Sequence, residues 1–281
     1  MASTKKLVSQ LSRSGPHKVL RGDMALVGVP GSVYTPARGT DLPGFAFGHG
    51  WMTSAGRYER LLRHLATWGI VAAAPNTERG PLASDAGLAA DLDTTLSVIS
   101  QTRLGTGDIT VHPERLAIGG HGFGAAAAVL ATHGAAAAVQ SIAALFPAPA
   151  SPNVEVAATA TDIPALVLGA PGELDTVSWN PLPMRTWLGD TATLRVLPKG
   201  NSRGIVEGRS AADWVLDTGG DKKVQAAVRA VLTGYLLATL TGDKQYRPFT
   251  DPEEVLGGIA TLDPATVEDD GLDLFSRLLK S

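Results

Sequence analysis

The pentapeptide GHGFG, from Gly120 to Gly124, lies between an apolar run and an alanine-rich run. Its outline follows G-x-S-x-G, the sharp turn that presents a nucleophilic serine at the end of a β-strand. The middle position is Gly122, which has no side chain and therefore no oxygen that can attack a carbonyl carbon. A glycine at this position also relieves the left-handed backbone strain that a serine would bear. The sequence thus predicts the turn of a nucleophile without the nucleophile.

Two histidines and a carboxylate offer a second kind of chemistry. His49 and His121 follow apolar runs whose carboxyl ends are expected to converge, and Asp175 follows a third such run. Packing and hydrogen bonding are our first interpretation of both histidines, and the alternatives are a pocket of two nitrogens and one carboxylate or an unusual acid–base pair. The chain has no H-x-H or H-E-x-x-H pattern and no cysteine, so we predict no metal site.

The same turn also satisfies the dinucleotide-binding pattern G-x-G-x-x-[GA], from Gly120 to Ala125. A true fingerprint is followed about 20 residues later by an acidic residue that binds the ribose. No Asp or Glu occurs between Glu114 and Glu155. We therefore predict no nucleotide cofactor, and no other cofactor is indicated.

The elements that must position these residues alternate as in an α/β protein. Apolar runs of strand length occupy 44–50, 70–75, 115–120, 141–147, 165–170 and 193–198. Several are apolar at every position, which is typical of strands that are covered on both faces. Helical periodicity occupies 54–68, 84–103 and 222–241. We therefore expect a mostly parallel central sheet with helices on both faces.

Finer features of these elements are also predicted. Two antiparallel strands over 18–37 are expected to be joined by a Pro-Gly turn at 30–31. Ser84 is expected to cap the second predicted helix. In the first predicted helix an apolar stripe places His64 on the opposite, polar face. Surface or helix-end positions are predicted for His17, His64, His112 and His133.

Composition restricts the classes of function. The chain has 281 residues, of which 44% are hydrophobic and 18% charged, as in an ordinary globular protein. Its net charge of −3 provides no overall basic field for nucleic acid or anionic lipid. It has no cysteine, no apolar signal-peptide core near its N-terminus and no apolar run of membrane length. We expect a soluble, cytoplasmic protein without a membrane span.

Residues 20–247 resemble the α/β-hydrolase superfamily, in particular its cutinase, polyester-hydrolase and dienelactone-hydrolase branch. The segments that carry the resemblance are GFAFGHGWMTSAGRYERLLRHLATWGIVAAAPNTERG, ERLAIGGHGFGAAAAVLA, PALVLGAPGELDTVS and ATLRVLPKGNSRGIVEG. The resemblance implies an N-terminal arm over 1–17, an α/β-hydrolase domain over 18–247 and an acidic C-terminal extension over 248–281. Because 148–163 is too short for a helical lid, we expect no lid domain and an open pocket.

The resemblance also locates the catalytic triad, whose members follow in the order serine, acid, histidine. These positions fall on Gly122, Asp175 and Arg203, so both the nucleophile and the base are absent. An arginine stays protonated in proteins and cannot accept a proton as histidine does. We expect Arg203 to form an ion pair with Asp175 or Glu173, or to bind an anion in the remaining pocket.

Other parts of the family's site are expected to persist. Its oxyanion donors are backbone N–H groups, which do not depend on side-chain identity and fall by resemblance on Trp51 and Phe123. Trp51 and Trp179 are expected either to line an aromatic-walled groove or to be buried in the core. Ser202 and Ser210 lie near the missing histidine, and neither lies on an elbow that would make it a nucleophile.

Three functions follow from these observations. The leading hypothesis is a non-catalytic pseudo-hydrolase that binds a small acyl or carboxylate ligand or a protein partner, with His49, Trp51, His121, Phe123 and Trp179 as ligand-binding residues. The alternative is an ester or lactone hydrolase with a mechanism that uses no serine. The third is a structural subunit, in a homo-oligomer or with another protein.

Overall fold

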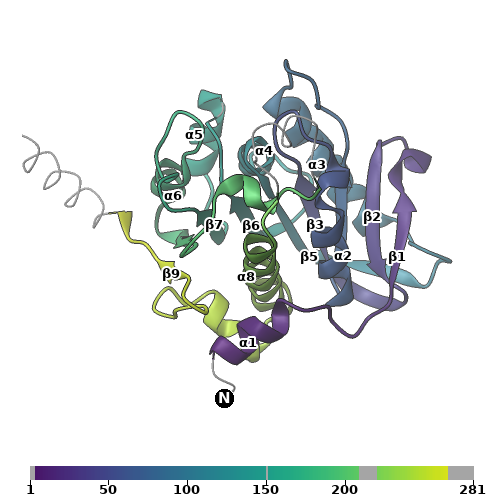
Figure 1. Ribbon diagram of the computed structural model, residues 1–281. Helices are drawn as coiled ribbons and strands as arrows, with labels where there is room; N and C mark the ends of the chain where they lie inside the picture. The colour runs from purple at the N-terminus through teal and green to yellow at the C-terminus, as the bar shows by residue number, and fades with distance from the viewer. Residues whose placement is uncertain (1–3, 150, 209–219, 265–281) are drawn as a thin grey trace, which may run out of the picture.

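The computed structural model describes residues 4–149, 151–208 and 220–264 (Figure 1). Nine strands form one sheet in the order β1-β2-β4-β3-β5-β6-β7-β8-β9. The strands are β1 (Val19–Asp23), β2 (Gly31–Pro36), β3 (Gly39–Gly48), β4 (Val71–Pro75), β5 (Ile109–His121), β6 (Val139–Leu145), β7 (Ala165–Gly169), β8 (Ala192–Val196) and β9 (Ala260–Thr261). Strands β3 to β8 are parallel, and the strands at both ends pair antiparallel. The predicted α/β class and mostly parallel sheet are confirmed.

Helices cover both faces of the sheet (Figure 1). The helices are α1 (Thr4–Leu11), α2 (Glu59–Thr67), α3 (Asp85–Gln101), α4 (Phe123–Ala131), α5 (Pro152–Thr159), α6 (Pro181–Leu188) and α8 (Lys222–Thr241), with 3₁₀ turns η1 (Met24–Val27), η2 (Ala55–Tyr58), η3 (Gly189–Thr191), η4 (Ser202–Ile205) and η5 (Lys244–Phe249). One apolar core joins α1, α2 and α8 to the sheet, and the other joins α3, α4, α5 and α6. On β3, Phe45 and Phe47 enter the first core and Ala46 the second, as the alternation of a strand requires.

The helix boundaries have local causes that the sequence partly reveals. The Ser84 hydroxyl accepts a hydrogen bond from the Gly87 N–H at 3.1 Å, which confirms the predicted cap of α3. The prediction that a Pro-Gly turn at 30–31 joins the two strands was wrong, because β1 and β2 are joined by η1. There Asp23 accepts from the Ala25 N–H and Gly28, at φ 86°, ends the turn. The sequence pattern identified both strands but not their connection.

Among the described residues, α8 is the one helix with the length and composition of a membrane span, with a mean hydropathy of 1.3. We expected no apolar run of membrane length from the sequence, and α8 departs from that expectation by its length and composition. In the structure 67% of its apolar window is buried, since the helix packs on β5, β6, α1 and α2. Its apolar composition is therefore explained by its place in the core.

Segments near both ends of the chain pack on the central layers. Helix α1 lies beside α8 and buries Leu7 and Leu11 (Figure 1). After η5, the chain returns to pair β9 with β8. Arg195 on β8 is fully buried and donates to the carbonyl oxygens of Asp251 and Glu254, each at 2.7 Å. The beginning of the segment predicted as an extension is thus fixed to the sheet by backbone acceptors.

Candidate functional site

The order of the strands identifies where a ligand site is expected. Strand β3 lies between β4 and β5. The connection after β3 leads to β4 on one side of it, whereas the connection after β5 leads to β6 on the opposite side. Ligands of open α/β sheets bind at such a switch point, outside the carboxyl ends of the strands. The loop that follows β3 contains Trp51, and the turn that follows β5 contains Gly122.

Close backbone packing explains the glycines of the GHGFG turn. A Cβ on Gly124 would lie 2.2 Å from the Gly48 carbonyl oxygen, and a Cβ on Gly120 would lie 2.4 Å from the Gly124 carbonyl carbon. The start of α4 therefore crosses the end of β3 with backbone against backbone. Gly122 has φ 57° and ψ −115°, so the centre of the turn has the positive φ that glycine adopts without the strain a serine would bear, as predicted.

The side chain of His121 is held in a buried hydrogen-bond chain. Its Nδ1 lies 2.8 Å from the Tyr58 hydroxyl, and that hydroxyl accepts from the Gly50 N–H at 3.1 Å. If the phenol donates to Nδ1, the proton of the neutral imidazole lies on Nε2. Burial lowers the pKa of His121 to about 3, although the Ser202 backbone opposes the shift. At pH 7 the ring is neutral.

The indole of Trp179 covers the centre of the turn. It stacks on the His121 ring with centroids 5.7 Å apart and an interplanar angle of 28°. A Cβ on Gly122 would lie 3.3 Å from Cζ3 of this indole. The Trp179 backbone is fixed in a tight turn in which it accepts from the Thr176 N–H at 2.7 Å. The indole ring therefore packs against the position that a side chain at residue 122 would begin from.

These groups line a cavity of 1040 Å³, which we call the switch-point cleft. It contains the predicted residues Trp51, His121, Gly122, Phe123, Trp179 and Arg203. Three apolar side chains of its lining, Trp51, Met52 and Val177, are 55%, 58% and 98% exposed. The rim thus presents apolar surface to solvent around the polar groups inside.

No protein-family model and no curated protein matches this chain. Its function therefore has to be inferred from the geometry and charge of the switch-point cleft.

Positive charge predominates in the cleft. Arg57, Arg79 and Arg203 line it, and the acidic residue among its described lining residues is Asp85. The Asp85 carboxylate already accepts from the N–H groups of Ala86 at 2.8 Å and Ser151 at 3.1 Å. The Phe123 N–H opens α4, so it has no acceptor within its own helix. Both the charges and this amide favour an anionic oxygen.

The predicted acid position does not face the cleft. Asp175 is exposed and does not line it, and within the described part of the chain neither Asp175 nor Arg203 forms an ion pair. The expected pairing of Arg203 with Asp175 or Glu173 is therefore absent. Instead, Glu173 accepts from the Ser202 N–H at 2.7 Å and joins the loop after β7 to the loop after β8. Arg203 extends into the cleft as an exposed cation.

His49 does not line the cleft, contrary to its predicted role in ligand binding. The ring is fully buried, with Nε2 2.7 Å from the Thr77 carbonyl oxygen and Nδ1 3.0 Å from that of Gly50. It ties the loop after β3 to the loop after β4. With Asp175 exposed as well, the considered pocket of two histidines and a carboxylate is not formed. Among the described residues no cluster suited to a metal ion is present.

One further expectation, the exposed position of His64, is corrected, and the two serines near the missing histidine can be placed. His64 is 5% exposed rather than on a solvated face, because its Nε2 donates to the Leu11 carbonyl oxygen at 2.8 Å. Burial lowers the pKa of His64 to about 4, and the charge of Arg229 adds to the shift. Ser202 is fully buried and outside the cleft lining, so it does not meet a ligand there. Ser210 lies outside the described residues.

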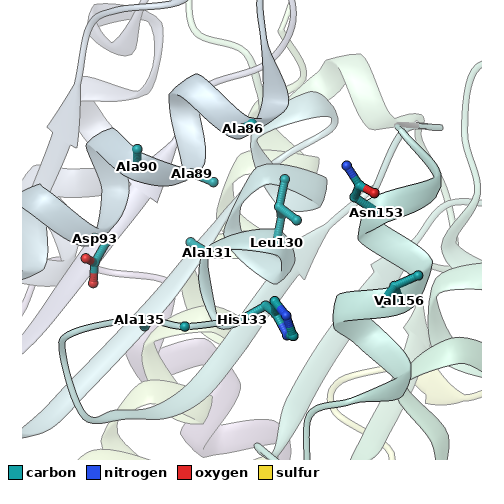
Figure 2. Close-up of a pocket in the computed structure, with 11 residues that line it drawn as sticks. Ala86, Ala89, Ala90, Asp93, Leu130, Ala131, His133, Ala135, Asn153 and Val156 are labelled. Carbon is teal, nitrogen blue, oxygen red and sulfur yellow. The ribbon is translucent and has the colours of Figure 1, made fainter.

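A second hollow between α3, α4 and α5 differs in character (Figure 2). Its volume is 430 Å³, and alanines of α3 form one wall while Asn153 and Val156 of α5 form the other. Its carboxylate, Asp93, accepts from the Ala136 N–H at 3.1 Å. No arginine or lysine is present among its described lining residues. The switch-point cleft is larger and has more polar groups, so we take it as the candidate site.

Proposed function

We propose that this chain is a catalytically inactive member of the α/β-hydrolase superfamily that binds a small acyl or carboxylate ligand in the switch-point cleft. The observation that carries the proposal is that the turn at the cleft has Gly122 in place of a nucleophile and that the indole of Trp179 packs against this glycine. The arrangement of the loops supports the family. Trp51, Gly122, Asp175 and Arg203 follow β3, β5, β7 and β8 at the same carboxyl edge of the sheet.

The groups needed for acyl transfer are missing from the cleft. Gly122 supplies no nucleophile, and a permanently protonated Arg203 supplies no base. His121 is too weak a base near neutral pH, since burial lowers its pKa to about 3 and its Nδ1 is held by Tyr58. Asp175 lies in solvent outside the cleft and orients no other side chain. A substrate ester would be bound without being attacked.

Binding of a carboxylate uses the groups that remain. A guanidinium at the mouth of the cleft and the free N–H at the start of α4 both favour an anionic oxygen. Trp51, Phe123 and Trp179 provide walls against which an acyl or aromatic group packs. The combination favours a monocarboxylate with an apolar tail over a small inorganic anion.

The test is the unfolding of the native chain with butyrate, octanoate and benzoate in separate titrations. A ligand at 100 times its Kd is expected to add about 2.7 kcal/mol to the free energy of unfolding. Arg203→Gln is expected to weaken this stabilisation, whereas Arg38→Gln, an equal change of charge at an exposed residue before β3, leaves it unchanged. The absence of stabilisation by all three acids would contradict the ligand and favour a structural subunit.

A non-serine esterase is the second candidate, favoured by the buried Tyr58–His121 pair beside the cleft. Hydrolysis of short-chain p-nitrophenyl esters by the native chain, Gly122→Ala and Asp175→Ala separates the two functions. We expect all three to match buffer, and a fluorophosphonate probe to label none of them. A native rate that disappears in His121→Phe but persists in Asp175→Ala would establish catalysis by the histidine.

A further inference from the structure

A separate cleft of 520 Å³ lies where the loop after α1 meets α2 and α8, and we call it the arginine cleft. Four arginines line it: Arg13 from the loop, Arg60 and Arg63 from α2, and Arg229 from α8. His17 contributes a further ring, and none of the described lining residues is acidic. The cleft shares no lining residue with the switch-point cleft.

This concentration of positive charge is unusual for a chain with a net charge of −3. Arg60 and Arg63 are three residues apart on α2, where like charges repel and cost stability. Glu207 lies near them and accepts from the N–H groups of Arg60 and Leu61, each at 2.9 Å. Its charge attracts Arg229 as well, but its oxygens already accept from two backbone N–H groups, and it does not line the cleft. An added anion would relieve the repulsion.

The loop that carries Arg13 and His17 is already held in place. The Gly15 N–H donates to the Thr67 hydroxyl at 2.8 Å, and the His17 N–H donates to the Thr67 carbonyl oxygen at 3.1 Å. A Cβ on Gly15 would lie 2.3 Å from that same carbonyl oxygen, so the loop rests directly on the end of α2. A ligand would therefore bind to preformed walls and lose little free energy in ordering them.

We propose that the arginine cleft binds a soluble phosphorylated small molecule through its phosphoryl oxygens. Guanidinium groups match phosphoryl oxygens with paired, charge-assisted hydrogen bonds. A diphosphate carries enough negative charge to balance most of the four arginines, whereas a single carboxylate would leave most of them uncompensated. This site is independent of the carboxylate function proposed for the switch-point cleft.

The probe is inorganic pyrophosphate, titrated calorimetrically into the full chain at low and at physiological ionic strength. We expect one pyrophosphate per chain, with weaker binding at the higher ionic strength. The double variant Arg13→Gln/Arg63→Gln changes two exposed side chains and is expected to lose affinity by about tenfold or more. Arg38→Gln/Arg115→Gln removes the same charge at exposed positions outside the cleft and is expected to bind as the native chain does.

A flotation assay separates a soluble ligand from a lipid headgroup. Phosphatidylcholine vesicles with and without phosphatidic acid are mixed with the native chain and both double variants, and we expect no binding to either vesicle. Binding to phosphatidic acid vesicles without binding of pyrophosphate would overturn the soluble ligand and assign the cleft to a membrane headgroup. The absence of saturable binding, or equal losses in both double variants, would overturn the site itself.

Discussion

The GHGFG turn and the loops after β7 and β8 border the same cleft, but different forces fix them. In the turn, backbone atoms of α4 and β3 meet so closely that Gly120 and Gly124 have no room for a side chain. In the loops, the side chains of Asp175 and Arg203 are exposed and make no ion pair within the described part of the chain. Backbone packing thus preserves the frame of a site, while exposed side chains are free to change its chemistry.

The largest effect is expected from Gly124→Ala, which breaks the frame. Its methyl group would lie 2.2 Å from the Gly48 carbonyl oxygen, so the start of α4 has to move away from β3. We expect a loss of about 3 kcal/mol in the free energy of unfolding, measured by urea denaturation. Gly80→Ala is the matched control, because a Cβ there has no neighbour within 4 Å. Equal stability of the two variants would contradict the close crossing.

A second effect concerns acid and the buried rings, and for each ring it is smaller than the effect of Gly124→Ala. Burial lowers the pKa of His121 to about 3 and that of His64 to about 4, so both are neutral in the fold when the unfolded chain protonates near pH 6.5. Stability is therefore complete above pH 6.5 and falls as the pH drops, by about 2 kcal/mol per ring between pH 7 and 5. Burial raises the pKa of Glu207, which acts in the opposite direction.

Urea denaturation at several pH values between 7 and 5 measures this loss, and His64→Gln should reduce its slope by about half. A free energy of unfolding that stays constant across this range would show that both rings are charged in the fold, or that they are not buried.

The smallest effect is expected in the loops, where two carboxylates are compared. Asp175→Ala removes an exposed side chain and is expected to change the free energy of unfolding by less than about 0.5 kcal/mol. Glu173→Ala removes the same charge together with the acceptor of the Ser202 N–H, and a loss of about 1–2 kcal/mol is expected. Thermal unfolding in parallel distinguishes them. A larger loss of stability in Asp175→Ala than in Glu173→Ala would show that Asp175 is the carboxylate that joins the two loops.

Much of the sheet could be predicted because continuous apolar runs indicate strands that are buried on both faces of a sheet. All six central strands and the helices α2, α3 and α8 lie where the pattern indicated them. Strand β9 has two residues, too few to form a pattern. His64 was misplaced because its partner, the Leu11 carbonyl oxygen at the end of α1, is far away in the sequence, and a helical wheel of α2 alone does not include it.

The site was predictable only where backbone geometry decides it. The turn at Gly122 was predicted from its glycine pattern, and the cleft residues Trp51 and Phe123 were predicted from the family resemblance. The sequence did not indicate that Glu173, rather than Asp175, contacts the loop after β8. Both residues lie in an irregular loop, and their spacing does not determine the path of its backbone. The arginine cleft brings Arg13 beside Arg229, and no local signal connects residues so distant along the chain.

The guanidinium of Arg195 has a consequence for shortened versions of the chain. A protein ending at residue 247 would retain this side chain on β8 but lose the two carbonyl acceptors that follow η5. Burial already lowers the pKa of Arg195 to about 10, so a cation stripped of its acceptors would be costly to keep inside. The segment from 248 to 256 is thus an integral part of the folding unit, and truncation before it would expose the edge of β8 to other chains.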